Sequence, residues 1–171
     1  MTRRSDLVWA TLGEGGLILA MAAVGWVSGL PLIFASLGPT AYELVEQPHM
    51  KSARAYNVIV GHICALGAGF FALWILHAWS APNVLSAGVV SPARIWAATT
   101  AAVLTTLLCL LLKAGQPAAL ATTLLVSLGA MQTRKSAITI VIGVLIIATI
   151  GEPVRRIRLR MQNRTQGESQ G

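Results

Sequence analysis

Long apolar runs separated by short polar connections dominate the pattern of this sequence. Four runs are long enough to cross a membrane as helices, because a crossing helix needs roughly 20 apolar residues. They cover residues of about 12–37, 56–79, 93–113 and 136–152. The pattern predicts an all-α membrane protein with one transmembrane domain over residues 1–163 and a disordered tail over residues 164–171.

Two shorter apolar pieces lie between these runs, at residues of about 39–47 and 117–131. The second is about 15 residues long, which is too apolar for an ordinary loop and too short for a crossing. Each piece begins at a proline, Pro39 or Pro117, and proline is favoured at the first position of a helix. We therefore expect two re-entrant segments or half-helices. The alternative is that both prolines punctuate ordinary loops outside the membrane.

The distribution of Lys and Arg bears on whether the second short piece crosses. If it enters the membrane and returns, one side holds eight basic residues and the other holds five. If it crosses, the tail changes sides and the smaller number lies inside. Basic residues gather on the cytoplasmic side of membrane proteins. The count therefore predicts a returning segment, with both termini in the cytoplasm, in a multi-pass protein of the cell inner (plasma) membrane.

The two halves of the chain resemble each other. KSARAYNVIVGHICA, residues 51–65, and KSAITIVIGVLIIA, residues 135–148, share their first three residues and a glycine within a Val/Ile run. If both short pieces return, the two units of helix, short piece and helix have the same orientation. That arrangement is a parallel two-fold repeat, which some transporters have. Chance similarity between short membrane segments is the alternative.

Composition supports the membrane prediction and excludes other classes. Of the 171 residues, 55% are hydrophobic and 11% are charged, whereas about a quarter are charged in soluble domains. The net charge of +7 comes largely from arginines near the C-terminus, without the basic stripe of a nucleic-acid-binding protein. Cys64 and Cys109 lie inside apolar runs without metal-ligand spacing. We expect no catalytic residues, no metal, no cofactor and no enzymatic activity.

Half-helices would create an anion site. Their leading N–H groups carry partial positive charge, so two N-termini that face one cavity would bind a small anion. Threonine hydroxyls one turn away would add donors, and Glu43 shares a helical face with Thr40. The substrate-binding residues expected in the short pieces are Gly38, Pro39, Thr40, Gln116, Pro117, Thr122 and Thr123.

Asn57 and His62 are further candidates, in the first turns of the second long run. Strongly polar residues inside a membrane segment usually face the bundle interior or water. In one interpretation His62 lines the pathway, and in the other it is a hydrogen-bonded core histidine. Four basic residues flank the short pieces as an anion-attracting mouth, unless their position is an accident of topology. They are Lys51, Arg54, Arg134 and Lys135.

Two blocks, SLGPTAYELVEQPHMKSARAYNVIVGH at residues 36–62 and QPAALATTLLVSLG at residues 116–129, resemble the HPP family of integral membrane proteins. That family combines S-L-G-P-T-A and V-I-x-G-H with the motif H-P-P-A-G-A-T-T-L. The matching positions are Gly38, Pro39, Thr40, Asn57, Gly61, His62, Pro117, Thr122 and Thr123. His-Pro-Pro is Gln116, Pro117 and Ala118 here, and an amide cannot take over a proton-linked step from a histidine.

The resemblance implies a four-span membrane protein of transporter type, with members linked to nitrite movement across cyanobacterial and plastid membranes. We expect a transporter or channel for a small inorganic anion, with nitrite as the candidate that the family suggests. A homo-oligomer in the lipid bilayer is expected, because four crossings enclose little space and small residues allow close helix contacts. The alternative is a membrane scaffold or sensor that docks a partner through its basic C-terminal tail.

Overall fold

The computed structural model is helical over its described backbone, residues 3–168, and side chains are described for residues 6–163. The elements are α1 (Arg3–Ser28), α2 (Leu37–Glu46), α3 (Ala55–Ile75), the 3-10 helix η1 (Ala78–Ser80), α4 (Val84–Ala87), α5 (Pro92–Leu111), α6 (Pro117–Ser127) and α7 (Arg134–Glu168). Helices α1, α3, α5 and α7 are each long and apolar enough to cross a membrane. The predicted all-α membrane fold with four spanning helices is confirmed.

The ends of the helices differ from the sequence pattern in several places. The first spanning helix covers residues 3–28 rather than 12–37, because Gly29 adopts a left-handed φ of +68° and Pro31 follows it. Helix α2 begins at Leu37 rather than at Pro39. Helix α7 continues to residue 168, so residues 164–168, expected to be disordered, are helical. Residues 169–171 lie outside the described part of the chain.

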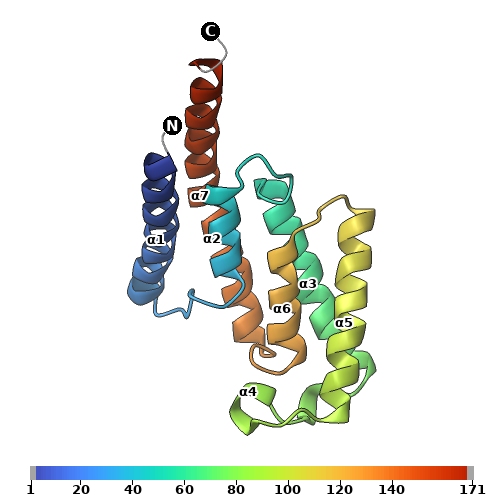
Figure 1. Ribbon diagram of the computed structural model, residues 1–171. Coiled ribbons are helices and arrows are strands. Elements are labelled where there is room, and N and C mark those ends of the chain that lie inside the picture. The colour runs from blue at the N-terminus through green and yellow to red at the C-terminus, as the bar shows by residue number, and fades with distance from the viewer. Residues whose placement is uncertain (1–2, 169–171) are drawn as a thin grey trace.

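Helices α1 and α3 run from one end of the bundle towards the other, and α5 and α7 run back in the opposite direction (Figure 1). We call the end where α1 begins and α7 finishes the terminal end, and the opposite one the far end. Helix α2 carries the chain from the far side back towards the terminal end, and α6 carries it from the terminal end towards the far end. With 10 and 11 residues, each short helix is about 15 Å long, which is half of a hydrocarbon core of about 30 Å.

Hydrogen bonds between the connections support this course. At the terminal end, Gln116 Nε2 donates to the backbone oxygen of Ser52 over 3.3 Å. At the far end, the backbone N–H of Val84 donates to the oxygen of Leu128 over 3.1 Å. The two short pieces with their connections therefore join opposite ends, which corrects the predicted topology of segments that return to the side they entered.

Two units of long, short and long helix, α1–α2–α3 and α5–α6–α7, consequently run in opposite directions (Figure 1). In each unit, the second long helix carries a glycine against which the start of the other unit's short helix packs. A Cβ added to Gly61 would lie 2.7 Å from Gln116 Cβ, and a Cβ added to Gly143 would lie 2.8 Å from Phe34 Cε1. Gly61 and Gly143 are 82 positions apart, and so are Phe34 and Gln116.

A second pair of glycines repeats the same relation. A Cβ added to Gly69 would lie 2.9 Å from the Val126 side chain, and one added to Gly151 would meet the Leu44 side chain. These positions are again 82 residues apart, Gly69 from Gly151 and Leu44 from Val126. The internal repeat is therefore inverted, and the parallel repeat expected from the sequence is corrected. Similar sequences mark α3 and α7 as equivalent but carry no information about their relative direction.

The basic residues divide unequally between the two ends. By their place in the described helices and connections, ten of the 13 Lys and Arg residues lie towards the terminal end, and the other three are Arg94, Arg134 and Lys135. This asymmetry is larger than the eight to five that returning segments would give.

Helix α1 is attached to one side of the bundle, where it contacts α2 and α7. Little of this helix is buried, and Trp26 and Val27 are 88% and 84% exposed. The apolar core is centred where α2, α3, α6 and α7 meet, around residues such as Leu44, Val126 and Ile147, and α1 contributes Leu17 and Met21 to it. The exposed apolar surface of the spanning helices is in contact with the lipid bilayer.

Candidate functional site

Buried hydroxyl groups lie in the contact between α2 and α6. Ser36, Thr40 and Thr122 are fully buried. Thr122 Oγ1 donates to Ser36 Oγ over 2.8 Å, and Thr40 Oγ1 donates to the backbone oxygen of Ser36 over 2.9 Å. Thr122 lies in the second turn of α6, whereas Ser36 directly precedes α2. The start of α2 therefore meets the middle of α6.

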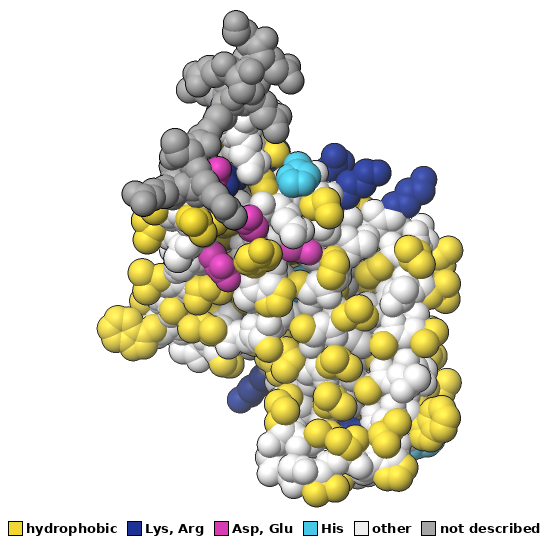
Figure 2. Space-filling view, viewed as in Figure 1, with side chains coloured by type: hydrophobic (Ala, Val, Ile, Leu, Met, Phe, Trp, Pro, Cys, Tyr) yellow, Lys and Arg dark blue, Asp and Glu magenta, His cyan; other side chains and the backbone are white. Residues whose placement is uncertain are grey.

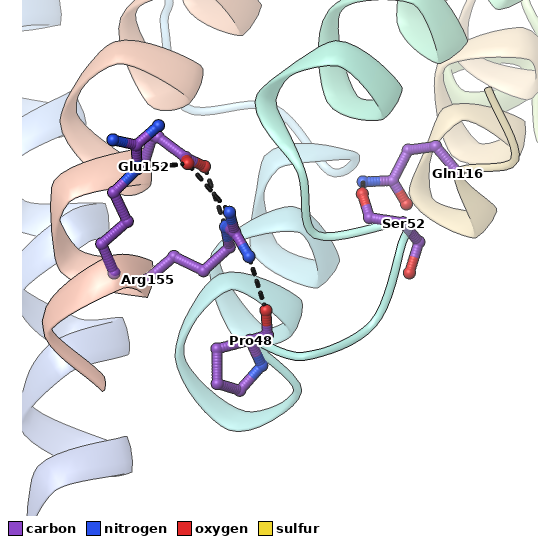
Figure 3. Close-up of polar contacts among 6 residues, drawn as sticks. Pro48, Ser52, Gln116, Glu152 and Arg155 are labelled. Carbon is purple, nitrogen blue, oxygen red and sulfur yellow. Dashed lines mark hydrogen bonds and ion pairs between the residues drawn. The ribbon is translucent and has the colours of Figure 1, made fainter. Parts of the chain in front are cut away.

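Gln116 occupies the terminal end of the same contact. It is the N-cap of α6, where its Oε1 accepts a hydrogen bond from the backbone N–H of Ala118 over 3.3 Å. Its Nε2 donates to the backbone oxygen of Ser52, and Figure 3 shows the two residues side by side. Pro117 follows at the first helical position, as predicted. The side chain of Gln116 thus joins α6 to the connection between α2 and α3.

Glu43 reaches Gln116 from α2. It lies in the last turn of that helix, outside the four spanning helices, on the face that carries Ser36 and Thr40. Burial raises the pKa of the Glu43 carboxyl, while hydrogen bonds from the side chains of Gln116 and Ser52 oppose that rise. Its buried Oε2 has no hydrogen-bond partner among the described residues. We call Ser36, Thr40, Glu43, Gln116 and Thr122 the polar seam.

The connection over residues 47–54 covers the terminal end of the polar seam and is fastened on two sides (Figure 3). On one side it is held by Gln116 through Ser52. On the other side, Arg155 Nη1 donates to the backbone oxygen of Pro48 over 2.8 Å, and Glu152 holds the same guanidinium through two further hydrogen bonds. The connection therefore couples α7 to α6.

The N-termini of the two short helices do not face one cavity, which corrects the expected site. Thr122, which contacts the start of α2, lies five residues after Pro117, about 8 Å along α6. Because α2 and α6 are antiparallel, their positive N-terminal ends point towards opposite ends of the bundle. Each end of the polar seam consequently has one helix N-terminus.

Comparison with known families decides the assignment. The family model described as HPP, transmembrane region, matches residues 1–163. The chain belongs to the HPP family. Neither the curated proteins nor the solved structures contain a match to it. In this HPP protein the His-Pro-Pro positions are Gln116, Pro117 and Ala118, and they form the first turn of α6 at the terminal end of the polar seam.

Asn57 of the HPP protein lies beside the polar seam and holds the connection that leads into α6. Its Nδ2 donates to the backbone oxygen of Gly115 over 3.1 Å, and the hydroxyl of Tyr56 donates to that of Leu112 over 3.0 Å. Gly61, one turn further along α3, leaves the space that Gln116 fills. These residues fix the position at which α6 starts.

His62 is 1% exposed and lies apart from the polar seam's hydrogen bonds. Its Nδ1 contacts the backbone oxygen of Val58 at 2.8 Å, and its Nε2 has no hydrogen-bond partner among the described residues. With Ile140, Val144 and other apolar side chains it lines a cavity of about 10 Å³ between α3 and α7, about the volume that one water centre requires. This arrangement fits the core-histidine interpretation through Nδ1 and leaves Nε2 available.

The remaining predicted residues are dispersed in the HPP protein. Thr123 faces α5, where its hydroxyl hydrogen bonds with that of Thr105 at 2.8 Å. Pro39 is exposed on α2 and Gly38 is half-buried. The expected anion-attracting mouth is divided: Lys51 and Arg54 lie in the connection at the terminal end, whereas Arg134 and Lys135 begin α7 at the far end. The expected mouth therefore does not exist as one surface.

An acidic cleft lies between α1 and α2. Asp6, Glu14 and Glu46 are among the residues that line this cavity of about 410 Å³. Figure 2 shows acidic side chains gathered on this face, while most of the visible basic side chains lie elsewhere. Among the described residues no group of three or more His, Cys, Asp or Glu side chains is arranged to hold a metal ion. The cleft therefore has an acidic lining, separate from the polar seam.

Sequence reasoning missed Ser36, Ser52 and Arg94. Ser36 begins the block at residues 36–62 but was not selected as a site residue, because its contact with Thr122 depends on the packing of α2 against α6. No local signal marks Ser52. The fully buried guanidinium of Arg94 donates hydrogen bonds to the oxygens of Ala81, Pro82 and Ser127 and to Gln132 Oε1, and so joins the far-end connections.

Proposed function

We propose that this HPP protein transports a small inorganic anion across the membrane along the polar seam, with nitrite as the candidate anion. One observation carries the proposal: two half-helices of an inverted repeat meet through buried hydroxyl groups in the middle of the bundle. Inverted repeats with short helices at the midplane are a recurrent transporter architecture.

The chemistry of the polar seam suits a weakly basic oxyanion. Hydroxyl groups of Ser36, Thr40 and Thr122, together with the amide of Gln116, provide donors that can replace part of a hydration shell. Helix N-termini at the two ends of the seam supply partial positive charge without a buried cation. The path needs no metal and no covalent step.

The path is closed in this conformation. Ser36, Thr40 and Thr122 have no exposed surface, and Ser36 and Thr122 are in direct contact. Transport therefore requires α2 and α6 to separate at one end and then at the other. In an inverted repeat the inward-open and outward-open states arise by exchanging the conformations of the two units.

We place the terminal end, with ten basic residues, in the cytoplasm. Helix α1 offers a large apolar face, which supports assembly of protomers through that helix. The alternative role as a docking scaffold loses support, because several arginines at the end of α7 are engaged within the chain. Arg155 and Arg156 pair with Glu152, and Arg158 pairs with Asp6.

Anion flux into proteoliposomes tests the proposal. Uptake of nitrite, nitrate, formate and chloride is compared for the wild type, Thr122→Val and Thr123→Val. The two substitutions are matched, since both remove a buried hydroxyl from α6, but only Thr122 belongs to the polar seam.

The expected result is flux of nitrite in the wild type, a loss of at least about tenfold in Thr122→Val, and near-normal flux in Thr123→Val. Equal losses in both variants contradict a path along the polar seam. Absence of flux for all four anions, from protein shown to be folded, contradicts the transport function.

A further inference from the structure

Glu43 is the one titratable residue of the polar seam as defined by the described residues. The other members are two threonines, a serine and a glutamine. Its carboxyl lies at the terminal end, where the side chains of Gln116 and Ser52 stabilise its ionised form, and one of its carboxyl oxygens is buried with no hydrogen-bond partner among the described residues. A carboxylate at this place holds the same donors that an anion entering from the terminal end would need.

The inverted repeat shows that the polar seam has a carboxyl group at its terminal end and none at the equivalent position of its far end. The 82-residue relation that connects Gly61 with Gly143 also connects Glu43 with Leu125, and Gln116 with Phe34. The far-end counterpart of the Glu43–Gln116 pair is therefore a pair of apolar residues. Protonation can change the charge of the polar seam only at its terminal end.

No cation neutralises Glu43 among the described residues. On α7, Arg155 is taken by Glu152 and by the backbone oxygen of Pro48. On the 47–54 connection His49, Lys51 and Arg54 are exposed, and α6 has no titratable residue. The acidic residues of α1, Asp6 and Glu14, line the separate cleft together with Glu46 of α2. The buried histidine of α3, His62, lines the cavity between α3 and α7.

We propose that Glu43 is a proton-operated gate at the terminal end of the polar seam. When ionised, its carboxylate occupies the donors of Gln116 and Ser52 and repels an arriving anion. When a proton from the solution at that end binds to the carboxylate, the group becomes neutral and the donors become available to the anion. This inference rests on the proposed transport function and adds its regulation.

The direction of the pH dependence follows from the surroundings of Glu43. Burial raises the pKa of its carboxyl, so the neutral form persists to higher pH than for an exposed glutamate. Flux should increase as pH falls through that raised pKa, and it should be low above it. Glutamine imitates the neutral acid and should remove this dependence.

The test uses the full chain in proteoliposomes, with nitrite, nitrate, formate and chloride as probes and pH varied from about 5 to about 9 at the terminal end. Glu43→Gln is compared with the matched control Glu46→Gln. Glu46 lies one turn away on the same helix, is exposed, and belongs to the acidic cleft. In a parallel measurement, dicyclohexylcarbodiimide, which reacts with protonated carboxyl groups in apolar surroundings, labels the wild type, and mass spectrometry locates the adduct.

The proposal predicts that wild-type and Glu46→Gln flux fall together at alkaline pH, whereas Glu43→Gln retains its acid-pH flux and exceeds the wild type by about tenfold there. As pH rises, labelling at Glu43 should disappear with the same midpoint pH as the wild-type flux. If flux occurs but Glu43→Gln keeps the wild-type pH profile, the gate is refuted while transport stands. If no protein carries any of the four anions at any pH, both proposals fail. Labelling that is independent of pH also refutes the gate.

Discussion

Replacing Gly61 by alanine tests whether the start of α6 is seated against α3 as described. The added Cβ would lie 2.7 Å from Gln116 Cβ and 3.3 Å from the backbone oxygen of Ala114. Ordinary carbon contacts are about 3.5–4.0 Å long, so the first turn of α6 must move by close to 1 Å. Gly67→Ala is the matched control on the same helix, because nothing lies within 4 Å of its added Cβ.

The expected difference between these two variants can be worked out directly. Both replace glycine in the interior of α3, so the gain in helix propensity of about 1 kcal/mol is common to both. Overpacking then costs Gly61→Ala about 1–3 kcal/mol that Gly67→Ala does not lose. For a chain of this size, that cost corresponds to a melting temperature lower by about 2–12 °C.

Thermal unfolding of the two purified variants in the same detergent, followed by circular dichroism, measures this difference. Gly143→Ala should have a smaller effect than Gly61→Ala, because its nearest neighbour is the edge of the Phe34 ring rather than a Cβ close to the backbone. Equal melting temperatures for Gly61→Ala and Gly67→Ala would refute the described seating of α6.

Three further predictions concern other parts of the molecule. Arg94→Met leaves several buried acceptors without a donor, so it should destabilise the protein by about 3 kcal/mol in the same melting assay, whereas Met in place of the exposed Arg54 should have little effect. Glu43→Gln should raise stability near neutral pH. Because the pKa of the Glu43 carboxyl is raised in the folded protein, wild-type stability falls as pH rises from the ordinary glutamate pKa to the folded one. The same pH dependence of stability in the wild type and in Glu43→Gln would contradict this. Cysteines placed at Lys51 and Lys135 in a cysteine-free background should react with an impermeant maleimide from opposite sides of the membrane, and reaction from one side would contradict the inverted topology.

Apolar length was sufficient to predict the four spanning helices, since each long helix overlaps a long apolar run. Their exact ends depend on local backbone features that length does not reveal. The chain turns at Gly29 and Pro31, inside the run taken as the first span. On α7 the apolar pattern ends before the helix does, because the hydrogen bonds and ion pairs of Glu152, Arg155 and Arg158 continue to support it.

The topology could not be predicted, because the argument from charge assumed that a piece of about 15 residues either crosses alone or returns. In the structure each short helix continues into a non-helical connection. The short helix and its connection together join opposite ends of the bundle. Segments that return to the side they entered would place Lys51 and Arg54 at the end opposite the termini, whereas in the structure both lie at the terminal end. With the connections in place, the positive-inside rule is satisfied by ten residues against three.

The candidate site was predicted in its parts but not in its assembly. Thr40, Gln116 and Thr122 were selected from local motifs, and all three line the polar seam. The meeting of Glu43 with Gln116 requires α2 and α6 to be antiparallel, and that relation depends on tertiary packing at Gly61. Thr123 has the same local signal as Thr122, yet the rotation of α6 turns it towards α5.

A reversible cross-link across the polar seam tests the central claim most directly. Ser36 Oγ and Thr122 Oγ1 are 2.8 Å apart, so cysteines at these positions lie within reach of a disulfide. With Cys64 and Cys109 replaced by serine, the double-cysteine protein should lose nitrite flux on oxidation and recover it on reduction, because α2 and α6 can no longer separate. Undiminished flux through protein shown to be fully cross-linked would contradict transport along the polar seam.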